Sequence, residues 1–301
     1  MSVPIKMKIG IVVTLLVLCS HFYVVSAKAL IKGLALSPIR TESVVASGES
    51  VKYKLTLTNY SDRPMAVALS AEEFSVVGQS YDYSFDMQSN VSKWVTFDRT
   101  VVQLDPGKSS IVPYVVKVPQ DAEPGGRYIS LFASTDVQNV SGELSTEQRI
   151  ASLIYLTVKG NVTRTGELKS LQSPFVFDGY QPWKITIANR GTAHFRSRYS
   201  VSVRSIFDGQ EVASKTDDSL ILPSTTRAID APMPVLKYLG VYRAVYTVGL
   251  GDSPAVTREK YIIFLPKQLY VPLLSLIVIF VGGLVYGGWK IIRRIKRKSV
   301  D

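Results

Sequence analysis

The stretch Val51-Lys-Tyr-Lys-Leu-Thr-Leu-Thr58 alternates apolar and polar side chains and then reaches a turn-forming segment, Asn59-Tyr-Ser-Asp62. A period of two is typical of a β-strand with one face in a hydrophobic core, because successive side chains point to opposite faces of a sheet. Similar runs, separated by Gly, Pro, Asn and Asp, recur through the central region, at residues 65–69, 111–118, 127–133 and 150–158. No part of this region keeps a helical period. The sequence therefore predicts an all-β fold of immunoglobulin-like β-sandwiches.

The same kind of strand occurs a second time along the chain. Leu55-Thr-Leu-Thr-Asn59 has a counterpart in Ile185-Thr-Ile-Ala-Asn189, and each ends in an asparagine at a turn. Between them lies a polar stretch rich in turn formers, Gly160-Asn-Val-Thr-Arg-Thr-Gly166. We therefore expect two tandem β-sandwich domains, at residues 30–162 and 163–265.

The first 29 residues have the features of a secretory signal peptide. Lys6 and Lys8 precede an apolar run at 9–18, and Ala27-Lys-Ala29 supplies a small-x-small cleavage pattern. An N-terminal membrane anchor is the alternative, but the apolar run is shorter than the ~20 residues that span a bilayer. We expect residues 1–29 to be removed on export. The exported domains then contain no cysteine, since Cys19 is the only one, and must be stable without disulfides.

The C-terminal region predicts a transmembrane helix. The 21 residues from Leu269 to Trp289 include no charged side chain, which is enough to cross ~30 Å of hydrocarbon. Aromatic residues stand near both ends of this run, and six Lys and Arg residues follow between 290 and 298. Such basic clusters stay in the cytoplasm. We predict a transmembrane helix over 269–289 and a basic cytoplasmic tail over 290–301, which makes the chain a single-pass membrane protein with both β domains outside the cell.

The positive charge lies mainly in these two terminal segments. Of the net +11, three charges precede residue 30 and a net six follow residue 266, so the region between them carries only +2. Basic residues beside a membrane segment contact anionic lipid headgroups. The central region shows no basic patch of the kind that binds DNA or RNA, and we expect no nucleic-acid partner.

Four aromatic residues lie close together in the first domain, within the segment from Tyr81 to Trp94. Asp82, Gln88 and neighbouring Ser and Asn residues accompany them. Aromatic faces beside hydrogen-bonding groups suit saccharides and extended peptides. The candidate ligand-binding residues are Tyr81, Tyr83, Phe85 and Trp94. Alternatively, these rings fill the core between the sheets, which is the favoured interpretation for Trp94 and an open one for the two tyrosines.

The sequence offers little material for catalysis. His194 is the only histidine after the signal peptide, so no histidine cluster can hold a metal. The neighbouring carboxylates of Glu72-Glu73 and Asp217-Asp218 would point to opposite faces of a strand. No phosphate-binding or dinucleotide-binding motif is present. We expect a protein that is not an enzyme and that needs no cofactor.

The glycosylation pattern N-x-S/T occurs at four positions in the chain. Asn90 and Asn139 lie in polar, loop-like stretches where a glycan would fit. They are glycosylation candidates if the organism has the machinery.

The string Trp94-Val-Thr-Phe97, followed by Leu104-Asp-Pro-Gly107, Val118-Pro119 and Pro124-Gly-Gly126, resembles the WxL-interacting proteins of bacterial cell surfaces. The layout of tandem β domains before one membrane helix and a basic tail is similar too. The resemblance in residues is concentrated at 51–133, and the second half matches only loosely. It implies that the first domain binds peptidoglycan and that the second holds a surface protein.

Two functions follow from these features. The first is a membrane-anchored, extracellular binding or scaffold protein of the cell envelope, whose partner is a cell-wall polymer, a surface protein, or both. The alternative is an immunoglobulin-like chaperone or assembly factor that pairs a free strand edge with an exported protein. An open edge strand favours the second function, whereas a flat patch of aromatic and polar residues favours polymer binding.

Overall fold

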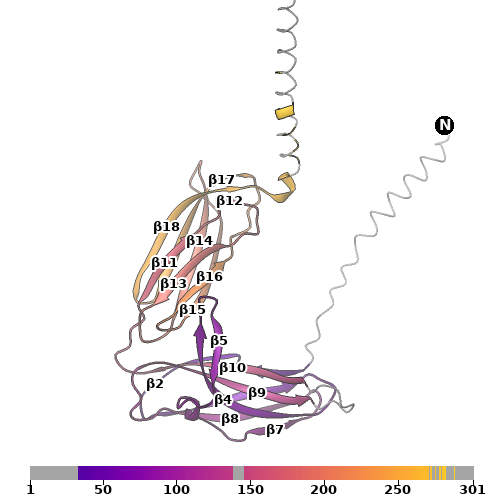
Figure 1. The fold of residues 1–301 in the computed structure, drawn as a ribbon, viewed down its shortest axis with the longest axis vertical. Helices are drawn as coiled ribbons and strands as arrows, with labels where there is room; N and C mark the ends of the chain where they lie inside the picture. Colours follow the sequence, from indigo (N-terminus) through magenta and orange to yellow (C-terminus); the bar gives the residue numbers. More distant parts are fainter. Residues whose placement is uncertain are drawn as a thin grey trace, which may run out of the picture.

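The protein is built from two β-sandwiches that follow one another along the chain (Figure 1). The computed structural model describes residues 33–137 and 146–270, together with residues 272, 275, 278, 280–282 and 288. The strands of the second sandwich run along the long axis of the molecule, and most of those in the first run across it (Figure 1). The all-β, immunoglobulin-like fold predicted from the alternating pattern is confirmed.

The first domain consists of two sheets. One has the strand order β1 (Leu34–Ser37), β3 (Ser50–Asn59), β8 (Ser109–Lys117) and β6 (Val95–Phe97). The other has the order β2 (Arg40–Val45), β10 (Thr146–Val158), β9 (Gly125–Val137), β4 (Met65–Val77) and β5 (Asp82–Asp86), with β7 (Val101–Leu104) also paired to β4. A single 3-10 turn, η1 (Ser92–Trp94), precedes β6.

The core of the first domain follows from the period of two. Leu55 and Leu57 of β3 are fully buried, whereas Thr56 between them is only partly buried. Ile129 and Leu131 of β9 and Ile154 of β10 face them from the second sheet. Burying side chains of this size stabilises a domain by roughly 1.5–3 kcal/mol each.

The first two strands belong to different sheets. β1 pairs antiparallel with β3 in one sheet, and after Pro38 the chain crosses to the other sheet, where β2 pairs parallel with β10. β2 covers β10 only from Leu153 to Val158. The first half of β10 is therefore left without a neighbour on that side among the described residues.

The second domain repeats the architecture. One sheet has the order β11 (Gly166–Gln172), β13 (Trp183–Asn189) and β16 (Thr226–Ala231). The other has the order β12 (Val176–Phe177), β18 (Ser253–Phe264), β17 (Gly240–Leu250), β14 (Phe195–Ser205) and β15 (Glu211–Ile221). Trp183 and Tyr246 are fully buried between these sheets, with ring centroids 4.8 Å apart.

Asn59 and Asn189, which end the two matching strands, have the same role in both domains. The side-chain amide of Asn59 donates to the carbonyl oxygens of Arg63 (2.7 Å) and Leu104 (3.0 Å). That of Asn189 donates to Ala193 (2.9 Å) and Ile221 (3.0 Å). Each side-chain oxygen accepts the backbone N–H two residues later, at 2.8 Å. The repeat seen in the sequence is therefore a repeated turn with the same hydrogen bonds.

The C-terminal exit of the second domain begins with the 3-10 turn η2 (Lys267–Leu269) and continues into helix at Tyr270. The predicted membrane segment 269–289 lies largely outside the described residues, and the predicted signal peptide and cytoplasmic tail lie wholly outside them. Within the described part of the chain, none of the helices has the length and hydropathy needed to cross a membrane.

Candidate functional site

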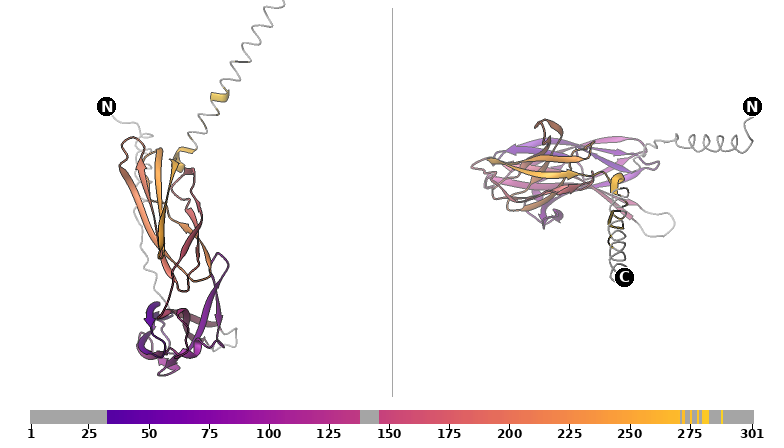
Figure 2. Two further views of the ribbon diagram at one scale, coloured as in Figure 1. Left: turned by 90° about the vertical axis from the view of Figure 1, so that its left-hand side faces the viewer. Right: turned by 90° about the horizontal axis from the view of Figure 1, so that it is seen from above.

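The hairpin between β4 and β5 rises from the first domain to the second (Figures 1 and 2). Its turn residue Tyr81 has a positive φ of 68°, and its ring is buried. The Tyr81 hydroxyl accepts a hydrogen bond from the backbone N–H of Leu222 at 2.7 Å and shares another with the Thr225 hydroxyl at 2.5 Å. The Arg227 guanidinium lies over the ring, 4.5 Å from its centroid. The hairpin is thereby fixed to the second domain.

A small hydrophobic cluster completes this junction. Phe74, Tyr128 and Tyr155 lie on the outer face of the β10-β9-β4-β5 side of the first domain and pack with Leu220 and Leu222 of the second. The backbone N–H of Gly126 also donates to the carbonyl oxygen of Thr192 at 2.9 Å. Because hydrophobic, aromatic and backbone contacts all cross the junction, we expect the two domains to hold one relative orientation.

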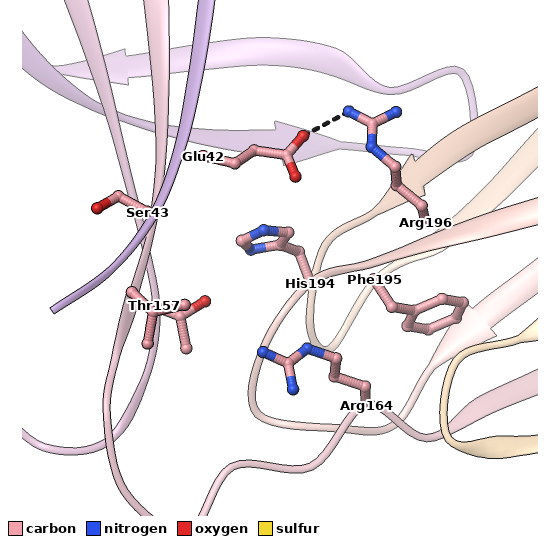
Figure 3. Close-up of a pocket in the computed structure, with 8 residues that line it drawn as sticks. Glu42, Ser43, Thr157, Arg164, His194, Phe195 and Arg196 are labelled. Carbon is pink, nitrogen blue, oxygen red and sulfur yellow. Dashed lines mark hydrogen bonds and ion pairs between the residues drawn. The ribbon is translucent and has the colours of Figure 1, made fainter.

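A pocket of about 320 Å³ opens at the side of this junction (Figure 3). Glu42 on β2 and Arg196 on β14 face each other across it and form an ion pair at 2.5 Å. Arg196 also contacts Asp218 at 2.7 Å. Arg164, from the segment joining the domains, and His194 also line it, together with the apolar side chains of Val44 and Phe195. The pocket therefore combines charged and apolar groups.

His194 is buried against aromatic rings at the bottom of this pocket. Its Nδ1 lies 3.3 Å from the Tyr128 hydroxyl, and its ring contacts the rings of Tyr128 and Tyr155. Burial lowers the pKa of His194 from 6.5 to about 4, with Glu42 opposing the change and Arg164 adding to it. His194 is therefore neutral at pH 7. It acts as a packed element of the junction and has no second histidine beside it.

The outer face of the first domain is open beyond the junction and carries a group of side chains that we call the ring patch: Glu72, Phe132, Arg149, Tyr83 and Phe85. The buried carboxylate of Glu72 forms an ion pair with Arg149. The Arg149 guanidinium lies 3.4 Å from the centroid of the Phe132 ring. Phe132 in turn meets Phe85 edge to face at 4.9 Å.

Tyr83 and Phe85 form the exposed end of the ring patch. Their rings are stacked, with centroids 6.1 Å apart and an angle of 9° between the planes. Tyr83 is 50% exposed and Phe85 is 40% exposed. Stacked, half-exposed rings on a rigid sheet form a surface on which an apolar or saccharide face can lie.

The first half of β10 lies at the opposite side of this sheet. Leu153 and Lys159 donate their backbone N–H groups outward, to Ile39 and Val45, at 2.9 Å each. Since N–H groups alternate between the two sides of a strand, the N–H groups of Arg149 and Ala151 also point outward, where no described strand pairs with them. We call this stretch, residues 146–152, the open edge.

The structure separates the four aromatic residues singled out in the sequence. Tyr83 and Phe85 are exposed on the ring patch. Tyr81 is buried at the domain junction, and its hydroxyl is engaged there, so it does not join the other two on an open surface. Trp94 is partly buried and packs against the core of the first domain. The candidate ligand-binding surface is thus reduced to Tyr83 and Phe85.

The partners of these rings were not predicted from the sequence. Phe132, Arg149 and Glu72 belong to three different strands, and their neighbourhood depends on the register of β4, β9 and β10. The sequence shows a run of apolar residues in β9 and alternating polar residues in β10. This pattern predicts two strands but does not indicate which strands are neighbours in the sheet.

Two further predictions concern glycosylation and metal binding. Asn90 is exposed, as a glycan acceptor must be, whereas Asn139 lies outside the described residues. Over the described ranges 33–137 and 146–270, no three His, Cys, Asp or Glu side chains gather as a metal site.

No family model and no curated protein matches the chain. The resemblance to WxL-interacting proteins stays a prediction. Among solved structures, the class 5 fimbriae chaperone CfaA matches with 12% identity and a TM-score of 0.41, over 76% of this chain and 99% of that one. The CsuC–CsuE chaperone–tip adhesion subunit complex of Acinetobacter baumannii matches with 11% identity and a TM-score of 0.39, over 77% and 99%. The E. coli chaperone DraB matches with 17% identity and a TM-score of 0.36, over 77% and 98%. At these values the similarity does not bear on the function of this chain.

Proposed function

We propose that this protein is a membrane-anchored chaperone or assembly factor of the cell envelope, which holds an extended segment of an exported protein by strand addition at the open edge of β10. The open edge is the observation that carries the proposal. Strand addition needs a row of outward N–H and C=O groups without a partner, and no described strand pairs with this side of residues 146–152. An added strand would continue the line of β2 along β10.

Three other edges in the described part of the chain are less suited to this role. Proteins blunt exposed edges with charged residues, bulges, Pro and short strands. β15 carries Lys215, Asp217 and Asp218 on its free edge, and β11 is bulged after Leu168. β18 has Pro254 and a run of charged residues at 258–260. The open edge of β10 carries the charged residues Glu147 and Arg149 at its start, but has none of these features at 150–152, where the sequence is Ile-Ala-Ser.

The surroundings of the open edge suit a polypeptide. The Arg149 side chain reaches away from the open edge, over Phe132 of β9 to Glu72 of β4, and so does not lie over the edge. Ala151 is small and leaves room for side chains of an added strand. The second sandwich packs on the same face at Phe74, Tyr128 and Tyr155, beyond the open edge.

The location follows from the sequence. A signal peptide over 1–29 and a transmembrane helix over 269–289 place both domains outside the cell, with a short cytoplasmic tail. A binding role without catalysis is in keeping with a single buried histidine, and neither a cofactor nor nucleic acid enters the proposal.

A proline substitution tests this function directly. Ala151→Pro removes one outward N–H but leaves the hydrogen bonds between β10 and β9, which use the alternate residues. The full chain, purified from its own envelope in detergent, should lose co-purifying exported proteins when it carries Ala151→Pro. Ala151→Ser keeps the N–H and should retain them. Identical partners on both variants would contradict strand addition at this edge.

The stacked rings of Tyr83 and Phe85 favour a second candidate function, the binding of a wall polymer such as peptidoglycan. Such a surface suits the faces of sugar rings and lies on the same sheet, across from the open edge. The two functions involve different residues and are separable by substitution.

A further inference from the structure

The end of the second domain that is remote from the first domain is formed by several loops that lie together. Ser205 of β14 pairs with Tyr242 of β17, and Gly240 of β17 pairs with Phe264 of β18. Val176 of β12 pairs with Ile263. The turn after β14, the loop before β17, the segment around β12 and the chain exit after β18 therefore meet at one end, seen at the top in Figures 1 and 2. We call them the exit-end loops.

The exit-end loops carry large apolar side chains that face solvent. Phe207 is 93% exposed, and Tyr238 is 76% exposed. Four more side chains on these loops are more than half exposed: Phe175, Tyr180, Val235 and Leu239. They come from three separate loops, so the fold, and not one local sequence, brings them together.

This grouping is unusual for a surface in water. Single exposed apolar residues are common, but a cluster at one end of a domain marks a surface that contacts something apolar. The core of the second domain is complete without these residues, because Trp183, Tyr246, Phe177 and Phe264 already fill that end of the sandwich.

The C-terminal exit of the second domain lies against the exit-end loops and indicates what contacts their apolar side chains. The backbone N–H of Leu265 donates to Phe177 at 2.9 Å, and the Lys267 ammonium lies over the Tyr180 ring at 4.2 Å and 3.7 Å from Asp178. The exit is therefore tied to these loops. The uncharged run 269–289 starts two residues after Lys267, so a bilayer that holds this run lies next to the loops.

We propose that the exit-end loops dock on the lipid surface, with Phe207 and Tyr238 in the headgroup layer of the bilayer that holds residues 269–289. This inference rests on the membrane anchor in the proposed function. The Tyr238 side chain favours this layer because its ring is apolar and its hydroxyl stays wet. Phe207 adds an apolar ring that enters the boundary between headgroups and acyl chains. Docking would hold the second domain upright and direct the first domain away from the membrane.

The test uses full chain, with Cys19→Ala, reconstituted in phosphatidylcholine vesicles with or without brominated lipid. A fluorescent label is attached to one introduced cysteine at a time: Phe207→Cys, Tyr238→Cys, Val278→Cys or Val101→Cys. Val278 reports on the anchor. Val101 is an exposed apolar residue on β7 of the first domain and serves as the matched control.

Brominated lipid should quench the labels at 207, 238 and 278, and should leave the label at 101 unquenched. Quenching at 278 alone would overturn the docking of the loops and leave the anchor intact. Absence of quenching at 278 would overturn the anchor and, with it, the inference. Equal quenching at 101 and 207 would also contradict it, because the whole molecule would then lie on the bilayer.

Discussion

The hydroxyl of Tyr81 in the first domain accepts a hydrogen bond from the backbone N–H of Leu222 in the second, at 2.7 Å. Tyr81 occupies a left-handed conformation that bulky residues rarely adopt, and this places its ring in the junction between the domains. A residue in a hairpin turn of one sandwich thus satisfies a buried backbone donor of the other.

Tyr81→Phe should destabilise the full chain by about 1–3 kcal/mol, because the buried Leu222 N–H loses its acceptor. Urea unfolding in detergent measures the free energy of unfolding. Tyr60→Phe is the matched control, since this ring is half-exposed and is not part of the junction cluster, and a change below about 0.5 kcal/mol is expected. Equal effects of the two substitutions would show that the Tyr81 hydroxyl is not a structural contact between the domains.

The stability of the chain should fall in mildly acidic solution because of His194. Its pKa is about 4 in the folded protein and 6.5 in an unfolded chain, so the folded state favours the neutral ring. The resulting stabilisation is complete above pH 6.5 and is lost as the pH falls from 6.5 towards 4. The loss should reach at most about 3 kcal/mol, and partial exposure to solvent reduces it.

His194→Gln separates this effect from the protonation of other groups. The variant keeps a polar side chain beside Tyr128 but cannot take up a proton near neutral pH. The difference in unfolding free energy between parent and variant should therefore change between pH 6.5 and 4. A constant difference across this range would contradict a neutral, buried His194.

Asn59→Ala and Asn189→Ala should each destabilise their own domain by more than about 2 kcal/mol, because each removes a buried amide that serves two carbonyl oxygens and one N–H. Differential scanning calorimetry of the full chain should show a lowered transition in each case. Asn90→Ala, at an exposed position, should change stability by less than about 0.5 kcal/mol. If Asn90→Ala lowered stability as much as Asn59→Ala and Asn189→Ala, the hydrogen bonds of the repeated turn would not account for the loss.

The second candidate function predicts a measurable contribution from Tyr83 and Phe85. Replacing both by Ala should weaken co-sedimentation of the full chain with peptidoglycan by about 1–3 kcal/mol of binding free energy. Tyr60→Ala, another half-exposed aromatic residue of the first domain, should leave sedimentation unchanged. A double variant that sediments like the parent would remove polymer binding from the ring patch.

The strands and the repeat were predictable because they depend on local pattern. The alternation from Val51 to Thr58 matches β3, and the two asparagines at matching strand ends keep the same hydrogen bonds. The sequence did not predict that Tyr81 is buried at the domain junction whereas Tyr83 is exposed. Both belong to the same alternating face in the sequence, and only the positive φ at Tyr81 turns its ring towards the other domain.

The open edge could not be predicted from the sequence either. Residues 150–158 read as one continuous strand, and nothing in them shows that β2 covers only the half from Leu153 onward. That limit is set by where the chain crosses between sheets after β1. The ion pair between Glu42 and Arg196 likewise joins residues 154 positions apart, which a single sequence does not reveal.

Amide hydrogen exchange of β10, at single-residue resolution, tests strand addition most directly. The full chain alone is compared with the complex that co-purifies with it. The proposed function predicts slower exchange in the complex at the outward N–H groups of Arg149 and Ala151. Exchange at Ile150 and Ser152, whose N–H groups already face β9, should be slow in both samples. A stable complex in which Arg149 and Ala151 exchange as fast as in the chain alone would contradict the claim that a partner strand pairs with β10.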